Sequence, residues 1–213
     1  MNRSVKRLLT YPARLRRSLG FGVHSPFAYS FITKVLREKE AQYYAYGEIA
    51  AFCPRARKAT FNEIFAGKDI SIPEAHLIFR VLCHFNPSYV LEVGHGHEVT
   101  NVILSRAVPH ATVYSWDHSL TPRIPEGEGI EPFVLVNQLA MTSLDDLTDD
   151  IFTQLHRRDC VFVVRNIRFL EPARAIWEKL LGFKEFGMAF TDGYMGIFAG
   201  RRSLPFQVYD IIF

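Results

Sequence analysis

The stretch "YVLEVGHGHEVTNVIL", residues 89–104, decides the fold. It opens with a short apolar run, typical of a buried strand, which leads directly into two closely spaced glycines. "EVTNVIL" then begins a helix. A buried strand, a glycine turn and a helix in this order predict the nucleotide-binding loop of an α/β protein.

Apolar strands alternate with helical segments from residue 70 onward. A helix is predicted over 71–85, with Ser71 and Glu74 in the relation of a capping box. The segments "SYVLEV", "ATVYSW", "PFVLVN" and "CVFVV" are nearly continuous apolar runs, which indicates a parallel sheet covered on both faces. Right-handed crossovers make such a sheet doubly wound. Near the end of the chain, the Asp192-Gly193 pair between two apolar runs predicts an antiparallel hairpin.

The first third of the chain has a different pattern. We expect residues 1–69 to form a helical N-terminal extension, and residues 70–213 to form the main Rossmann-like domain. Ser25 is expected to cap a helix that begins at Pro26 and runs to about residue 38. A second helix is predicted over 38–53.

The composition is that of an ordinary globular protein, with 48% hydrophobic and 22% charged residues. There is no run of about 18 apolar residues, so no membrane span is expected. The basic N-terminus lacks the apolar block of a secretory signal. The three cysteines lie far apart, which fits buried thiols in a reducing cytoplasm better than a disulfide framework or a zinc site. We therefore expect a cytoplasmic protein.

The charge of the chain is unevenly distributed. Residues 1–37 carry +8 and contain no Asp or Glu, so the rest carries −5 of the net +3. An arm of this kind, centred on residues 1–17, can contact RNA, anionic lipid or the body of a partner subunit. The alternative is an amphipathic helix whose arginines simply face water. The segment lacks the interleaved aromatic residues and glycines of a base-stacking surface.

Several motifs resemble those of one family. The chain is similar to class I S-adenosylmethionine-dependent methyltransferases, and more narrowly to a bacterial family of methyltransferase-like proteins. The stretches that carry the resemblance are "GFGVHSPFAYSFI" (20–32), "YYAY" (43–46), "LEVGHGHEVT" (91–100), "VFVVRNIRFLEPARAIWEKL" (161–180) and "GYMGIF" (193–198). They span nearly the whole chain. The resemblance implies a mainly parallel, Rossmann-like sheet that ends in an antiparallel hairpin, with S-adenosylmethionine as the cofactor.

The resemblance also implies a set of site residues. In this fold the cofactor lies across the carboxyl ends of the strands. Glu92 would meet the methionine ammonium of the cofactor, and Asp117 would accept the ribose hydroxyls, with Trp116 or His118 beside the adenine. The residues assigned to cofactor binding are Glu92, Gly94, His95, Gly96, Asp117 and Asn137.

The chain departs from the family at three places. Glu98 replaces the closing glycine, and its carboxylate would repel the pyrophosphate of a dinucleotide more than it would S-adenosylmethionine, which has no phosphate. Asn137 stands where the family has Asp, and Arg165 and Asn166 replace an acidic pair. Only 15 residues, 118–132, separate Asp117 from the core of the next strand, where the family normally has a helix and a strand. This implies that one βα unit and one edge strand are missing. An exposed edge favours a homodimer.

Arg165 and two histidines allow further alternatives. A cation at Arg165 is hostile to the Mg²⁺ of catechol-type methyltransferases, so we expect no catalytic metal. Arg165 could bind an anionic acceptor or pair with Glu171 or Asp159. His95 and His97 could act as a general base, serve as two ligands of a zinc ion, or simply face solvent.

Three functions follow from these features. The first is a methyltransferase whose acceptor, a small molecule or a polymer, is unknown, with His24 and Ser25 of the first motif helping to line or cover the pocket. The second is a non-catalytic binding or assembly module that keeps the fold, which the lost acids favour. The third is an RNA-contacting protein that uses the basic arm. Fold alone does not decide among them.

Overall fold

The computed structural model describes most of the chain. The described residues are 3–38, 43–53, 70–94, 98–116, 130–138, 152 and 158–213. The predictions for His95, Gly96, His97, Asp117 and His118 fall outside these residues, and so does most of the connection in which a βα unit was expected to be missing.

The core of the structure is a seven-stranded mixed sheet with the order β2-β1-β3-β4-β6-β5-β7. The strands are β1 (Tyr89–Gly94), β2 (Thr112–Trp116), β3 (Phe133–Gln138), β4 (Cys160–Val164), β5 (Met188–Thr191), β6 (Gly196–Gly200) and β7 (Gln207–Asp210). Only β6 runs antiparallel to its neighbours. This confirms the predicted α/β fold, a mainly parallel, Rossmann-like sheet that ends in an antiparallel hairpin.

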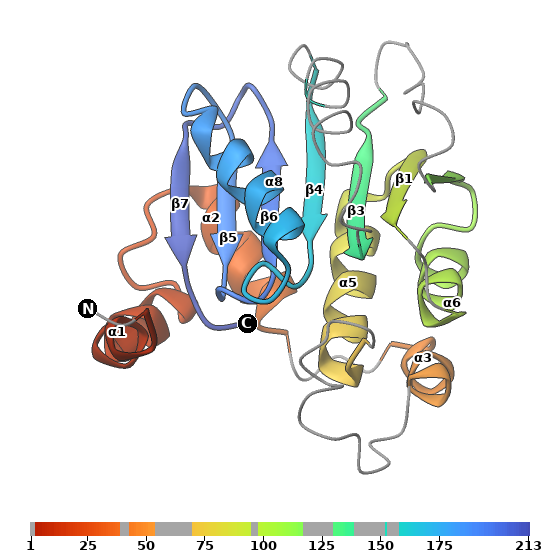
Figure 1. The fold of residues 1–213 in the computed structure, drawn as a ribbon, viewed down its shortest axis with the longest axis horizontal. Coiled ribbons are helices and arrows are strands. Elements are labelled where there is room, and N and C mark those ends of the chain that lie inside the picture. Colours follow the sequence, from red (N-terminus) through yellow and green to blue (C-terminus); the bar gives the residue numbers. More distant parts are fainter. Residues whose placement is uncertain are drawn as a thin grey trace.

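Helices cover both faces of the sheet, and Figure 1 shows α8 in front of it with α2 and α5 behind. The helices are α1 (Arg3–Ser18), α2 (Pro26–Phe31), the π-helical turn η1 (Ile32–Leu36), α3 (Tyr46–Phe52), α5 (Ile72–Phe85), α6 (Glu98–Ala107) and α8 (Glu171–Gly182). All of β1 and β4 is buried, because such strands have a helix layer on each side. Successive residues therefore enter different cores: Val90 packs with α5, and Leu91 packs with α8.

The N-terminal helices share the larger of these two cores. Ser25 caps α2 as predicted, since its hydroxyl accepts a hydrogen bond from the Ala28 amide at 3.3 Å. The Phe31 ring lies 5.0 Å from the Phe190 ring of β5. The next helix begins at Tyr46, later than predicted. The boundary between an extension and a main domain at residues 69 and 70 stays a prediction.

The predicted hairpin is confirmed, and a further strand follows it. Strands β5 and β6 pair antiparallel, and the Asp192 carboxylate accepts hydrogen bonds from the amides of Tyr194 and Met195 in the turn. Gly193 has a φ of 84°, which favours glycine. Strand β7 was not predicted. It pairs parallel to β5 and completes the edge of the sheet.

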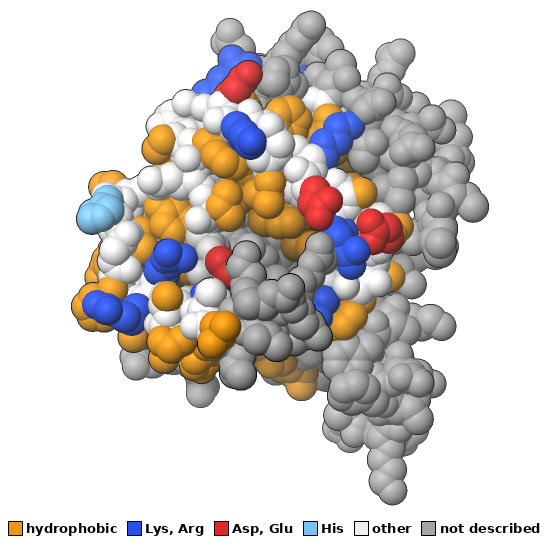
Figure 2. Space-filling view, turned by 60° about the vertical axis from the view of Figure 1, so that its left-hand side comes forward, with side chains coloured by type: hydrophobic (Ala, Val, Ile, Leu, Met, Phe, Trp, Pro, Cys, Tyr) orange, Lys and Arg blue, Asp and Glu red, His pale blue; other side chains and the backbone are white. Residues whose placement is uncertain are grey.

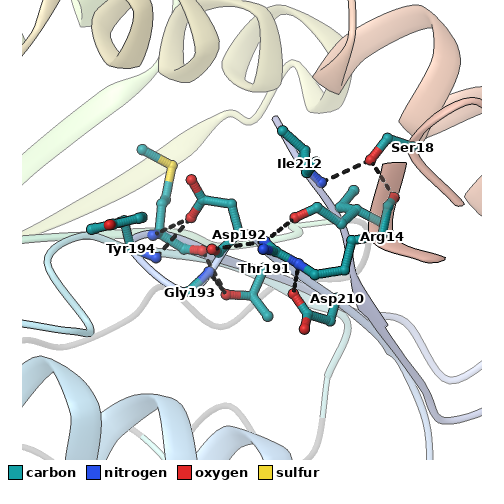
Figure 3. A network of polar contacts seen from close by, with 10 residues as sticks. Arg14, Ser18, Thr191, Asp192, Gly193, Tyr194, Asp210 and Ile212 are labelled. Atoms are coloured by element: carbon teal, nitrogen blue, oxygen red, sulfur yellow. Dashed lines mark hydrogen bonds and ion pairs between the residues drawn. The ribbon is translucent and has the colours of Figure 1, made fainter. Parts of the chain in front are cut away.

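One arginine of the basic arm does not face water. Arg14 of α1 is only 5% exposed. Its guanidinium donates hydrogen bonds to the Asp210 carboxylate at 2.6 Å and to the backbone carbonyls of Asp192 and Ile211 (Figure 3). The expectation of a helix whose arginines all face solvent is therefore wrong for Arg14, because this side chain ties the helix to the sheet.

The cysteines are free, as expected, but they are not all buried. Cys53 and Cys160 are buried, whereas Cys83 on α5 is exposed. Burial raises the pKa of the Cys160 thiol to about 12. Within the described residues, every helix is too short or too polar to cross a bilayer.

Candidate functional site

The candidate site lies where the strand order reverses. Strand β1 lies between β2 and β3. The chain passes from β1 to β2 on one side, and then crosses to β3 on the other side of β1 and continues to β4. In open α/β sheets the ligand crevice lies outside the carboxyl ends of the strands at such a switch point. Strand β1 ends there at Gly94, whose φ of 90° is a conformation that residues with a side chain rarely adopt.

Glu92 is the acid of this switch point. Its side chain leaves β1 on the same face as that of Ser115, its register partner in β2. The carboxylate accepts hydrogen bonds from the Ser115 hydroxyl at 3.0 Å and from the Asn137 amide at 2.5 Å. Glu92 is 1% exposed, and this burial raises the pKa of its carboxyl group. The hydrogen bonds and the nearby Arg165 oppose the rise.

Arg165 continues this network toward α5. It follows β4 directly and is 0% exposed. Its Nε donates to a Glu74 carboxylate oxygen at 2.7 Å, and its Nη1 donates to the Asn137 side-chain oxygen at 3.4 Å. We call Glu74, Glu92, Ser115, Asn137 and Arg165 the strand-end network. Arg165 pairs with an acid as one alternative suggested, but neither suggested partner was right.

The two suggested partners are bound elsewhere. Glu171 pairs with Arg174 one turn along α8, and the Asp159 carboxylate accepts a hydrogen bond from the Arg202 amide. Arg165 instead meets α5, whose first turn lies at the carboxyl end of the sheet. Its guanidinium lies beside Glu74, so an acceptor anion would have to compete with this ion pair.

The raised pKa of Glu92 predicts a pH-dependent effect of Glu92→Gln. A carboxyl group whose pKa is higher in the folded state stabilises the fold at low pH, and this contribution is lost as the pH rises through the folded-state pKa. Gln carries no charge; its oxygen can accept from the Asn137 amide while its NH2 group donates to the Ser115 hydroxyl, which reverses that hydrogen bond. Urea unfolding at about pH 5 and about pH 8 should show Glu92→Gln gaining stability relative to the native chain as the pH rises. If the free energies of unfolding of the two proteins differed by the same amount at both pH values, the raised pKa of Glu92 would be contradicted.

Other predicted site residues are not part of this network. Glu98 is the first residue of α6 and is exposed. Its negative charge there stabilises the helix through the helix dipole. Trp116 ends β2 and is buried in the core on the α8 side. Ser25 caps α2 and donates a hydrogen bond to the Met188 sulfur at the beginning of β5. Because β5 runs in the direction of β1, Ser25 lies at the opposite end of the sheet from Gly94 and does not line this site.

Two members of the network were not predicted as site residues. Glu74 was assigned only to a capping box, and Ser71 does accept a hydrogen bond from its amide at 3.4 Å. A helix that precedes the first strand of this fold begins at the carboxyl end of the sheet, which is a signal that could have placed Glu74 there. Ser115 could have been found as well, because Glu92 in "SYVLEV" and Ser115 in "ATVYSW" are both the second residue from the end of the predicted strand.

The described residues offer no cluster of metal ligands. Among the side chains that the structure describes, no three of His, Cys, Asp or Glu gather as a metal site would require. A small apolar cavity lies on the α8 face, near the beginning of β4, and thus away from the strand-end network. Its walls are formed by Phe152, Cys160, Phe162, Leu180, Phe183, Phe186 and Phe198.

Comparison with known proteins adds little to this geometry. No family model matches the chain, and no curated protein matches it. Among solved structures, it is similar to the O-methyltransferase TomG from Streptomyces achromogenes, which was solved in complex with SAM and is involved in tomaymycin synthesis. The two share 16% identity, with 76% of this chain and 91% of that chain covered and a TM-score of 0.42. A likeness of this size says nothing about activity.

Proposed function

We propose that this chain binds S-adenosylmethionine at the switch point and acts as a methyltransferase-type protein. The observation that carries the proposal is the composition of that point. The two strands that flank the crevice, β1 and β3, contribute Glu92 and Asn137, and β1 ends in a glycine of positive φ. A buried acid beside a glycine turn suits a ligand with an ammonium group and no phosphate.

The described residues fit the amino-acid end of the cofactor. Gly94 leaves the chain without a side chain where it turns away from the sheet, so a ligand can approach the backbone. Each carboxylate oxygen of Glu92 accepts one hydrogen bond from a neighbour and keeps further acceptor capacity. We further propose Asp117, with His95 and Gly96 of the glycine turn, as the contacts to the rest of the ligand.

The chemistry of the site sets limits on the reaction. Bound S-adenosylmethionine supplies an electrophilic methyl group. Arg165 stays protonated at neutral pH and is paired with Glu74, so it cannot deprotonate an acceptor. Glu92 is assigned here to the ammonium group of the ligand rather than to the acceptor. The described residues would promote transfer by holding an acceptor in line with the methyl group.

Thermal unfolding with added ligand tests binding. S-adenosylmethionine or S-adenosylhomocysteine at 100 times its dissociation constant should stabilise the chain by about 2.7 kcal/mol and raise the melting temperature by roughly 5–10 °C. Gly94→Ala should lose most of this shift, because a methyl group fills the approach and the positive φ resists a side chain. Asp117→Ala should lose it as well.

Gly193→Ala is the matched control. Gly193 has a similar φ of 84° but lies in the hairpin turn, so the substitution adds comparable backbone strain away from the switch point. Its ligand-induced shift should equal that of the native chain. If both glycine variants lost the shift equally, the effect of Gly94→Ala would reflect general destabilisation, and the switch-point site would be wrong.

A non-catalytic assembly module is the second candidate. It is favoured by the closed hydrogen bonding of the strand-end network, which satisfies Glu92 and Arg165 without any ligand. Within the described residues β2 has one strand neighbour, and Val113 and Tyr114 on it are exposed. Such an edge can pair with a second copy, so the homodimer stays a prediction. Absence of any thermal shift with either ligand would favour this candidate.

A further inference from the structure

Helix α1 is attached to the rest of the protein by its polar side. Arg14 and Ser18 are spaced by one helical turn and are both buried. The Ser18 hydroxyl accepts a hydrogen bond from the Ile212 amide at 2.7 Å, next to the three contacts that Arg14 makes (Figure 3). An amphipathic helix on a globular protein normally packs by its apolar side, so this arrangement is reversed.

The side of α1 opposite Arg14 and Ser18 is exposed to solvent. Leu9, Ala13 and Arg16 follow one another at helical spacing on this side, and all three are exposed. Leu9 is 68% exposed. Just beyond the helix, Leu19 and Phe21 are also exposed, Phe21 to 60%. Three large apolar side chains, one on α1 and two just after it, are thus exposed within the short segment 9–21.

The charged side chains that accompany these apolar residues are positive. Arg16 and Arg17 are exposed in the last turn of α1, and residues 1–37 contain no acid. The acid that reaches α1, Asp210, is paired with Arg14. Figure 2, which brings this side of the molecule forward, shows hydrophobic and basic side chains side by side in its lower left part. We call Leu9, Arg16, Arg17, Leu19 and Phe21 the α1 surface.

We propose that the α1 surface binds the headgroup region of an anionic membrane, with α1 lying in the plane of the interface. A helix with an apolar side and flanking cations binds there because its apolar side chains enter the acyl boundary while Lys and Arg meet anionic headgroups. Arg16 lies among the apolar residues, and its long side chain can extend toward the headgroups while its stem stays in the apolar layer.

Two other occupants fit the surface less well. A second copy would place two surfaces of the same positive charge against each other, and like charges in contact oppose association. An RNA would use the cations but would leave Leu9 and Leu19 without an apolar environment, because nucleic acids are bound through phosphates and stacked bases. Of these three occupants, the anionic bilayer alone satisfies both the positive charge and the apolar side chains.

Co-sedimentation of the full chain with lipid vesicles tests the proposal. The chain should bind vesicles of equimolar phosphatidylcholine and phosphatidylglycerol, bind pure phosphatidylcholine much less, and lose affinity as salt is added. Arg16→Gln with Arg17→Gln should weaken binding about fivefold per charge removed. Leu9→Ser with Phe21→Ser should weaken it about tenfold or more with every charge intact.

Matched variants separate the α1 surface from general effects. Phe52→Ser removes a phenylalanine of similar exposure, 47%, from α3, which Figure 1 shows on the other side of the molecule. Lys184→Gln with Arg202→Gln removes two positive charges outside the basic arm. Both controls should bind like the native chain.

Three outcomes would overturn the proposal. The first is no binding to the anionic vesicles. The second is vesicle binding that Leu9→Ser with Phe21→Ser leaves unchanged. The third is binding of a uridine oligonucleotide that needs Arg16 and Arg17 but not Leu9 and Phe21, together with weak vesicle binding, which would assign the arm to RNA. Each can be read without reference to S-adenosylmethionine, so the membrane proposal and the proposed cofactor can fail separately.

Discussion

Arg165→Met should lower the free energy of unfolding by about 3–5 kcal/mol, because breaking a buried ion pair leaves an uncompensated charge. Arg165 is fully buried, and its guanidinium binds Glu74 and Asn137 at the carboxyl ends of the strands. Without it, Glu74 loses its partner, and the buried Glu92 carboxylate loses the nearby cation that lowers its pKa. Urea unfolding at neutral pH measures the change.

Two further variants test the cause of this loss. Arg174→Met removes an arginine whose ion pair with Glu171 is largely exposed, so it should cost less than about 1 kcal/mol. Replacing Arg165 and Glu74 together by methionine removes both charges and should recover a large part of the stability. If Arg165→Met cost no more than Arg174→Met, the strand-end network would not hold the sheet and α5 together.

Arg14→Met should cost about 2–3 kcal/mol. The substitution removes three hydrogen bonds from a charged donor and leaves the Ile211 carbonyl without its buried partner. The contribution of Asp210 is discounted, because that carboxylate is half exposed. The loss should appear in urea unfolding and should be accompanied by faster tryptic cleavage within α1, since the helix is then held mainly by Ser18.

Arg16→Met is the internal comparison for this experiment. Arg16 is two residues along the same helix and is exposed, so its replacement should change stability by less than about 0.5 kcal/mol. Equal losses for Arg14→Met and Arg16→Met would mean that α1 is held by something other than the contacts of Arg14.

The order of helices and strands could be read from the sequence where the patterns are strong. The predicted helix over 71–85 matches α5, because its cap at Ser71 and its apolar spacing agree. The Asp192-Gly193 turn placed the terminal hairpin correctly, since few other structures accept this pair between two strands. Strand β7 was missed because it is short and mostly exposed, with one buried side chain, Tyr209.

The candidate site was predicted less completely than the fold. Glu92 and Gly94 could be placed because they belong to a local strand-and-turn pattern. The partner of Arg165 could not, since Glu74 is 91 residues away and the pair forms only through packing of α5 on the sheet. The role of Arg14 was hidden for the same reason, as its partners lie at the other end of the chain.

Calorimetric titration of the full chain with S-adenosylmethionine measures cofactor binding at the switch point. We expect saturable binding at a single site per chain, strongly weakened by Gly94→Ala and unchanged by Gly193→Ala. A native chain that takes up neither S-adenosylmethionine nor S-adenosylhomocysteine, while unfolding cooperatively, would contradict the claim. The fold would then serve an assembly role, which the closed hydrogen bonding of the strand-end network favours over cofactor binding.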